Sequence, residues 1–192
     1  LYDTGPGSVE EGASWSLFEP VIAPARSARG PGGPDLVVVS HADLDHAGGV
    51  PDLLARFANV ELRINRRDGD HCTEGWSWAW DGVDFRVVHP SGFLPYLGND
   101  SSCVISIDNG RHRTLLSGDI STVVESRIAA RLGAHHLITV PHHGSASSSG
   151  PDLLFATRPA WAVVSAAYGN RFGFPRAEVL ERYRRHDSRC RR

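Results

Sequence analysis

Short apolar runs alternate along this chain with longer segments of helix-like composition. Runs rich in β-branched residues and bounded by glycine, proline and polar residues predict strands, and the segments between the later runs predict helices. We expect strands at 36–40, 60–64, 83–89, 102–108, 113–118, 136–140 and 160–165, and helices at 50–58, 121–132, 151–157 and 175–186. Strands that are first paired and then interleaved with helices indicate an α/β (α+β) protein whose helices cover the outer faces of its sheets. The Pro/Gly-rich segment 23–35 is predicted to be a loop or linker.

A dense polar cluster follows the first of these strands. The sequence SHADLDHAGG places two imidazoles, His41 and His46, and two carboxylates, Asp43 and Asp45, within six residues. Carboxylates crowded at a strand end repel one another unless a cation neutralises them, so we expect a divalent metal site. Mixed imidazole and carboxylate ligands suit zinc, manganese or iron, and the large share of oxygen favours manganese. The alternative is a cap for the following helix, which explains one or two of these residues but not four.

Two later strand ends carry further residues of ligand type. Asp119 closes the segment LLSGDI and precedes a helix, so it is either a helix cap or a carboxylate that bridges two metals. His142 and His143 follow the apolar run LITV. We expect His142 to be a metal ligand and His143 to face the substrate, with the reverse assignment as the alternative. Ser145 offers a hydroxyl donor to an anionic oxygen.

Length and composition are those of one ordinary globular domain, with 192 residues, 41% hydrophobic and 22% charged. The net charge of −2 argues against binding nucleic acid through bulk charge. All 20 basic residues are arginine, and the run from Arg182 to Arg192 holds six of them; this run is either a solvated helix end or a local phosphate contact. No apolar run reaches the roughly 20 residues that span a bilayer. The chain has no methionine, so we expect a piece of a longer protein.

Three cysteines are too few and too scattered for a disulfide framework or a zinc knuckle. Cys103 lies in the apolar run CVI and is expected to be a packed core thiol. A bridge between Cys72 and Cys190 stays open, and three cysteines do not indicate the cellular compartment.

Together these motifs resemble the metallo-β-lactamase superfamily, whose hallmark is H-x-H-x-D-H after a strand, with an aspartate and a histidine on later strand ends. Here Asp43 stands where the hallmark has its second histidine. The variant S-H-x-D-x-D-H-x-G-G resembles one branch, the metallo-β-lactamase-like domain of the ComEC DNA-uptake channels of bacterial competence. The segments YDTGP, WDGVDF, VVHP, NDSS, LSGDI, PHHGS and NRFGFP follow the order of that branch. One departure is Phe174, at a place where the branch usually has a histidine.

The resemblance implies an αββα sandwich formed by residues 1–192 as a single domain, truncated by about one strand at each end. It implies a parent protein of the bacterial inner membrane, with a membrane channel and an oligonucleotide-binding-like domain. This domain would be a soluble part of that parent on the extracytoplasmic face. On this basis we expect a metal-dependent phosphodiesterase, a nuclease that degrades one strand of incoming DNA and acts on single-stranded DNA.

On this interpretation the site residues take separate roles. Two divalent ions, manganese or zinc, are expected as cofactors and stabilise the attacking and leaving oxygens. His41 and Asp43 hold one ion, Asp45, His46 and His142 hold the other, and Asp119 bridges the two. The expected catalytic residues are Asp45, Asp119 and His143. The expected substrate-binding residues are Asn99, Ser102, His143, Ser145 and Asn170.

Two other functions stay open at this point. Asp43, Phe174 and the lack of a histidine near Asn99 favour a non-catalytic DNA-guiding module whose metal site has lost one ion. The other is a small-molecule metallohydrolase such as a lactonase, which the missing second histidine of the hallmark disfavours. Metal content separates catalysis from guiding: two equivalents favour the enzyme, and none in a folded protein favours the module.

Overall fold

The computed structural model of the chain divides into two compact units, Leu1–Cys72 and Thr73–Arg192. The structure describes residues 1–10, 13–28, 30, 32–67 and 72–191. The first unit has two two-stranded sheets, the second has one seven-stranded sheet, and each unit has its own hydrophobic core. Helices and strands are mixed throughout, which confirms the predicted α/β class. The expectation of a single domain over 1–192 stays a prediction.

A parallel pair of strands forms the centre of the first unit. β3 (Leu36–Val39) aligns with β4 (Glu61–Ile64), and α2 (Leu44–Ala47) and α3 (Val50–Arg56) connect them. All four residues of β3 are buried, as expected for the continuous apolar run LVVV in a parallel pair. A single bridge also joins Tyr2 to Val38, so the N-terminal segment lies along β3.

An antiparallel hairpin and two short helical segments complete the first unit. β1 (Gly7–Glu10) pairs with β2 (Ala13–Ser16), and the π-helix η1 (Phe18–Ile22) leads into α1 (Ala23–Ser27). The prediction of a loop over 23–35 was therefore wrong for its first five residues. Pro24 lies in the first turn of α1, where its missing N–H removes no helical hydrogen bond. The buried core of this unit is Phe18, Ala23, Val37, Val39 and Leu53.

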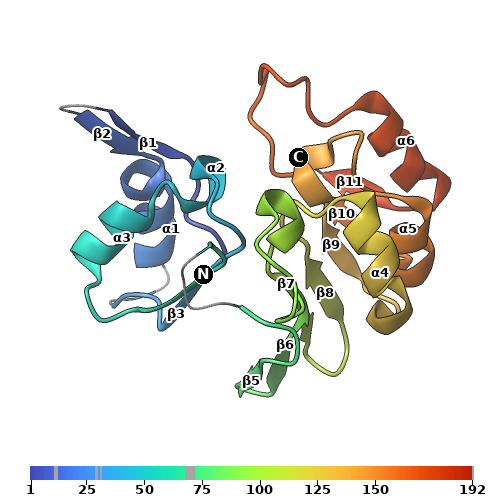
Figure 1. Cartoon of the computed structure of the whole chain (residues 1–192), viewed down its shortest axis with the longest axis horizontal. Helices are drawn as coiled ribbons and strands as arrows, with labels where there is room; N and C mark the ends of the chain where they lie inside the picture. Colours follow the sequence, from blue (N-terminus) through green and yellow to red (C-terminus); the bar gives the residue numbers. More distant parts are fainter. Residues whose placement is uncertain (11–12, 29, 31, 68–71, 192) are drawn as a thin grey trace. The chain divides into compact units, whose positions relative to one another are not determined.

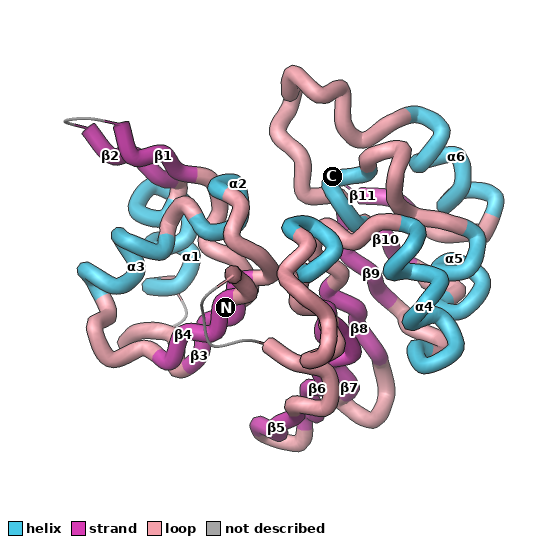
Figure 2. Tube along the Cα trace, viewed as in Figure 1, coloured by secondary structure: helices cyan, strands magenta, loops and turns pink. Residues whose placement is uncertain are grey.

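The second unit contains a seven-stranded mixed sheet of order β11-β10-β9-β8-β7-β6-β5 (Figure 2). Neighbouring strands are antiparallel from β5 to β8 and parallel from β8 to β11. The C-terminal ends of β8, β9 and β10 therefore meet at one edge of the sheet, where the segments after them come together. The strands are β5 (Ser77–Trp80), β6 (Val83–His89), β7 (Val104–Asp108), β8 (Arg113–Leu116), β9 (Leu137–Thr139), β10 (Trp161–Val163) and β11 (Arg189–Arg191).

Three helices pack against this sheet: α4 (Thr122–Leu132), α5 (Pro151–Thr157) and α6 (Ala177–Arg185) (Figure 1). Val124, Ile128 and Leu132 recur every four residues on α4 and join the same buried core as Leu115 and Ile138 of the sheet. The short 3₁₀ turns η2 (Gly98–Ser101) and η3 (Pro141–Gly144) precede β7 and follow β9. Among the described residues, no helix is long and apolar enough to cross a bilayer.

Every strand and helix predicted from the sequence occurs, and about half of the predicted ends lie one or two residues too far out. The predicted strand 83–89 matches β6, and the predicted helix 121–132 becomes α4 from Thr122. β11 was not predicted, because its sequence RCR has no apolar pattern and becomes a strand only by pairing with β10. One basic residue of the C-terminal run, Arg192, lies outside the described residues.

The cysteines differ from their predicted states. Cys72 and Cys103 are both disulfide-bonded, and Cys190 is a free, partly buried thiol. Cys103 is buried as expected, but as half of a disulfide and not as a core thiol. The open possibility of a Cys72–Cys190 bridge is wrong. Sequence spacing gave no guidance here, because a disulfide depends on the distance between two Cα atoms in the folded chain.

Candidate metal centre

In the first unit, the two histidines and two aspartates of the SHADLDHAGG motif lie together after β3. The rings of His41 and His46 are buried with centroids 4.3 Å apart, while the side chains of Asp43 and Asp45 are about half exposed. His41 Nε2 lies 3.6 Å from Asp43 Oδ2, and His46 Nε2 lies 3.7 Å from Asp45 Oδ2. Each imidazole thus turns the same nitrogen to a carboxylate, which is a donor set suited to a divalent cation.

Asp3 and Ser40 hold the opposite side of these imidazoles. His46 Nδ1 lies 2.8 Å from Asp3 Oδ2, and the Ser40 amide donates to Asp3 Oδ1 at 2.6 Å. The Ser40 hydroxyl lies 3.1 Å from His41 Nδ1 and 3.2 Å from His46 Nδ1. When Nδ1 donates to a carboxylate, the lone pair stays on Nε2, as in histidines that bind metals. Asp3 was not among the predicted site residues, although the YDTGP motif that contains it had been recognised.

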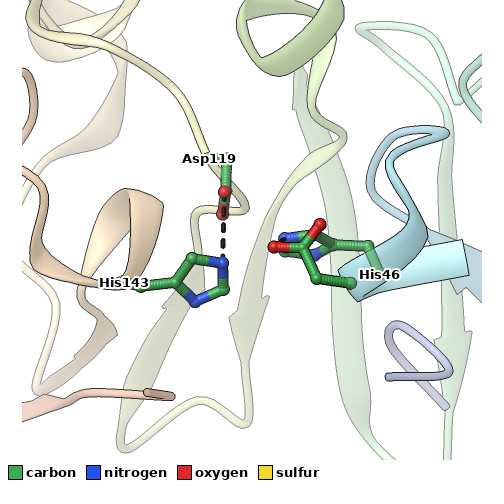
Figure 3. Close-up of side chains that lie close together, drawn as sticks. His46, Asp119 and His143 are labelled. Carbon is green, nitrogen blue, oxygen red and sulfur yellow. Dashed lines mark ion pairs between the residues drawn. The ribbon is translucent and has the colours of Figure 1, made fainter. Parts of the chain in front are cut away.

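In the second unit, Asp119 faces His143 (Figure 3). Asp119 follows β8 and is buried, and its amide donates to the buried hydroxyl of Ser102 at 2.9 Å. Asp119 Oδ2 lies 3.3 Å from His143 Nε2 and 4.0 Å from His142 Nε2. His143 Nδ1 donates to the Ser165 carbonyl at 2.7 Å, which leaves its Nε2 lone pair toward Asp119. This geometry favours the alternative assignment, in which His143 is the metal ligand.

The turn that carries both histidines has an unusual backbone. His142, His143 and Gly144 have φ angles of 50°, 54° and 82°, in the left-handed region that non-glycine residues rarely adopt. Non-glycine residues in this region cost of order 1–3 kcal/mol each and cluster at functional sites. Surrounding hydrogen bonds hold the turn: the His142 amide donates to the Gly118 carbonyl at 3.1 Å, and the Ser148 hydroxyl donates to the Pro141 carbonyl at 2.7 Å.

His142 has neighbours of a different kind from those of His143. The Asn99 amide nitrogen lies 3.2 Å from His142 Nε2, and the Ser147 hydroxyl lies 3.4 Å from His142 Nδ1. The ring of Phe174 is 5.9 Å from the His142 ring, in an edge-to-face arrangement. His142 is therefore a partly exposed imidazole between polar groups and an aromatic ring.

Three predicted substrate-binding residues have structural partners of their own. Ser102 is fully buried, so its hydroxyl supports Asp119 from inside the unit. The Ser145 hydroxyl lies 3.1 Å from that of Ser147. The Asn170 side chain donates to the Phe174 carbonyl at 2.7 Å and accepts its amide at 3.0 Å. Direct contact of these three with a substrate stays a prediction.

Sequence reasoning missed the buried carboxylate that supports the loop after His143. Glu125 of α4 is fully buried, and its two oxygens accept the amides of Ser149 and Gly150, each at 2.6 Å. Burial raises the pKa of Glu125 to about 7, against the opposing effect of these two amides and of Arg182. An acidic residue within a helix gave no signal of this role, because the contact is to a loop 24 residues away.

Comparisons with known proteins support the resemblance. The family model described as "Metallo-beta-lactamase superfamily" matches residues 1–167. Recombination protein 2 of Haemophilus influenzae is 36% identical over 98% of this chain, and Competence protein ComA of Neisseria gonorrhoeae is 31% identical over 97%. ComE operon protein 3 of Bacillus subtilis is 27% identical over 98% of the chain. The chain spans 24%, 26% and 28% of the length of these relatives, about a quarter of each.

Solved structures show the same fold. The metallo-β-lactamase fold protein YhfI of Bacillus subtilis matches with a TM-score of 0.56 at 11% identity, over 98% of this chain and 80% of that one. Zn²⁺-bound PqqB of Methylobacterium extorquens matches with a TM-score of 0.56 at 10% identity, over 99% of this chain and 80% of that one. At these identities the likeness shows the fold alone, and it confirms the predicted fold class.

Proposed function

Since the chain belongs to the metallo-β-lactamase superfamily, we propose that it is a metal-dependent phosphodiesterase, a nuclease that degrades one strand of DNA during competence. The observation that carries the proposal is the shared orientation of His46 and His143. Each donates from Nδ1 to a protein acceptor, Asp3 or Ser165, and turns Nε2 to an aspartate. The names of the relatives point to competence and recombination, and thus to a DNA substrate.

The donor set fits divalent metal ions. Imidazole nitrogens and carboxylate oxygens bind zinc and manganese, and softer ligands such as thiolates are absent from the two clusters described above. We propose two ions, and we propose as ligands four residues of the first unit and two residues of the second, each set taken by itself. When bound, these ions polarise a phosphoryl oxygen, neutralise developing charge and lower the pKa of water. The assigned ligands are His41, Asp43, Asp45, His46, Asp119 and His143.

The protein groups around His142 supply phosphate recognition in this proposal. The Asn99 amide and the His142 imidazole lie 3.2 Å apart and are both partly exposed, so a phosphate oxygen that meets one of them meets the other. The Asn99 amide nitrogen is a hydrogen-bond donor that can reach a phosphate oxygen. Ser102 and the left-handed turn hold Asp119 and His143 in place, so the cost of ordering them is met before substrate binds.

A second function, a DNA-guiding module without catalysis, is favoured by one observation. Asp43 Oδ2 lies 3.6 Å from His41 Nε2, close enough for a direct ion pair with a protonated imidazole when no metal is bound. In that case the cluster would be stable without ions. Metal content of the purified protein separates the two functions, as two equivalents favour catalysis.

We also propose that the domain lies on the extracytoplasmic face of the membrane. Disulfides persist in oxidising compartments and are rare in the cytosol, and Cys72 and Cys103 are disulfide-bonded. The proposed partners are a DNA strand, the membrane channel and an oligonucleotide-binding-like domain of the same parent chain. The relatives, about four times as long as this chain, leave room for such further parts.

Cleavage of labelled DNA tests the proposed activity. With Mn²⁺, the purified chain should cut single-stranded DNA, and Asp119→Asn should slow cutting by about 100-fold or more, because several kcal/mol of charge stabilisation depend on the metal. Asp187→Asn is the matched control, since Asp187 is exposed and has a left-handed backbone that asparagine also adopts. Equal cutting by wild type and Asp119→Asn would contradict the proposal.

A further inference from the structure

In the loop between β10 and α6, two arginines flank two aromatic rings. In the segment Arg171–Arg176, the Arg171 guanidinium lies 4.7 Å from the centre of the Phe172 ring, and the Arg176 guanidinium lies 5.6 Å from that of Phe174. The rings of Phe172 and Phe174 stack with centroids 5.5 Å apart and planes 20° apart. We call this set of four side chains the aromatic–arginine ladder.

Three of the four side chains of the ladder are exposed, and Phe174 is partly buried. Phe172 is 53% exposed, and both arginines are exposed. Nearby, Tyr168 is 99% exposed on the same loop. From Ala166 to Arg176 the loop has two arginines and no acidic residue, so its local charge is positive although that of the whole chain is −2.

Hydrogen bonds within the second unit hold the backbone of this loop in place. Asn170 donates to the carbonyls of Ala167 and Phe174, at 2.9 and 2.7 Å, and accepts the Phe174 amide at 3.0 Å. The Arg176 amide donates to the Gly144 carbonyl at 2.9 Å, which joins the loop to the turn that carries His142 and His143. A platform that is already ordered loses little conformational entropy when a ligand binds.

One end of the ladder meets the candidate metal centre within the second unit. The Phe174 ring lies 5.9 Å from the ring of His142, whose neighbour His143 faces Asp119 at 3.3 Å. A polymer lying along the ladder would therefore reach His142 at the Phe174 end. Aromatic faces next to arginines are what an unpaired nucleic-acid strand needs: bases stack on the rings, and phosphates pair with the guanidinium groups.

We propose that the aromatic–arginine ladder is a binding track for single-stranded DNA. On binding, the Arg171 and Arg176 guanidinium groups leave the faces of Phe172 and Phe174 to contact phosphates, and bases stack on the ring faces that they uncover. The inference rests on the proposed nuclease function, because it makes DNA the occupant. It adds residues that no metal chemistry requires, and it selects an unpaired strand, since the bases of a duplex are already stacked on one another.

Binding measured without cleavage tests the track. Fluorescence anisotropy of a labelled oligothymidylate is followed with the chelator-treated chain, so that the strand stays intact. Phe172→Ala and Phe174→Ala should each weaken binding by about 5- to 100-fold, the range known for loss of one base-stacking ring. Phe172→Trp should restore it. Arg171→Ala should lower the slope of log affinity against log salt by about 0.7.

Three controls make the result specific. Phe155→Ala removes a phenylalanine that is 78% exposed on α5 and is not part of the loop, and this variant should bind as wild type does. An abasic oligomer with the same number of phosphates should bind wild type and Phe172→Ala equally. A duplex of the same length should bind wild type and Phe172→Ala with equal affinity. Phe172 is exposed, so its variant should keep the circular dichroism spectrum and melting temperature of wild type.

Two results would overturn the track: unchanged binding of the oligothymidylate by Phe172→Ala, or an equal loss of binding for the abasic strand or the duplex. These outcomes are distinct from failure of the proposed function. A chain that binds through the ladder but cuts nothing with Mn²⁺ would contradict the nuclease alone. If the chain cuts single-stranded DNA but neither phenylalanine substitution changes its affinity for the oligothymidylate, the track alone is contradicted.

Discussion

At the scale of single residues, the metal proposal depends on how histidine nitrogens are oriented. The contacts of Asp3 with His46 and with the Ser40 amide fix which nitrogen of His46 carries the proton. Ser165 does the same for His143 through a backbone carbonyl. These supporting groups matter because a ligand that must reorient binds a metal more weakly.

Removing the charge of Asp3 should therefore weaken metal binding without touching a ligand. Asp3→Asn keeps a residue that tolerates the left-handed backbone at φ 58°, but its amide oxygen cannot serve both Ser40 and His46 as the carboxylate does. We expect metal affinity to fall by about 10- to 100-fold, measured by competition with a chelator. Asp35→Asn, at an exposed position in the same unit, should leave the affinity unchanged. An unchanged affinity in Asp3→Asn would mean that His46 is not a ligand.

The sequence identified the candidate residues better than it divided their roles. The sequence pointed to His41, Asp43, Asp45 and His46 because four residues of ligand type within six positions have no simpler explanation. The choice between His142 and His143 was beyond the sequence, since it depends on two consecutive left-handed residues and on the distant carbonyl of Ser165. Phe174 was visible as a departure from the family, but its stacking partners were not.

At the scale of elements, α4, α5 and α6 meet at the loop after His143. Glu125 of α4 accepts the amides that open α5, and Arg182 of α6 donates to the Ser148 carbonyl at 2.9 Å. A carboxylate at the N-terminus of a helix is also favoured by the helix dipole. Side chains of α4 and α6 thus hold the end of the loop that bears Ser145 and Ser147.

The raised pKa of Glu125 predicts a pH dependence of stability. The folded chain keeps the proton up to about pH 7, whereas the unfolded chain loses it near the ordinary value of 4.5. The folded state binds more protons in this window, so the free energy of unfolding falls as pH rises through it, by up to about 3 kcal/mol. Glu125→Gln does not titrate and should remove this fall.

Urea unfolding at pH 5, 6, 7 and 8 measures this fall as the difference in the free energy of unfolding between wild type and Glu125→Gln. Every other titrating group is common to both proteins and cancels in that difference. Glu178→Gln, at an exposed position on α6, is the control and should follow wild type. A difference that stays constant, or that moves in favour of wild type as pH rises, would contradict the account of Glu125.

Elements were predictable where local sequence determines them. The runs that became β3 and β6 are apolar or alternate, and α4 has a four-residue apolar period. β11 and α1 were missed for opposite reasons: β11 forms only through pairing with β10, and α1 lies in a segment whose prolines and glycines predict a loop. Tertiary pairing of this kind overrides local preference.

At the scale of the whole molecule, the disulfide-bonded cysteines are the feature that the sequence left undetermined. Reduction should lower the free energy of unfolding by about 2–5 kcal/mol, the usual cost of losing a native disulfide from a domain. Urea midpoints with and without a phosphine reductant measure this, and Cys72→Ser should match the reduced wild type. Cys190→Ser should retain the full response to reductant, since Cys190 is free. A wild-type midpoint that does not respond to reductant would contradict a stabilising disulfide.

The most direct test of the central claim is a titration of metal-stripped protein with Mn²⁺, in which bound metal and the cleavage rate of single-stranded DNA are measured in the same samples. We predict no cleavage without metal, a rate that rises as the ions bind, and saturation at two equivalents per chain. Cleavage by the stripped protein, or two bound equivalents with no cleavage, would contradict a metal-dependent nuclease.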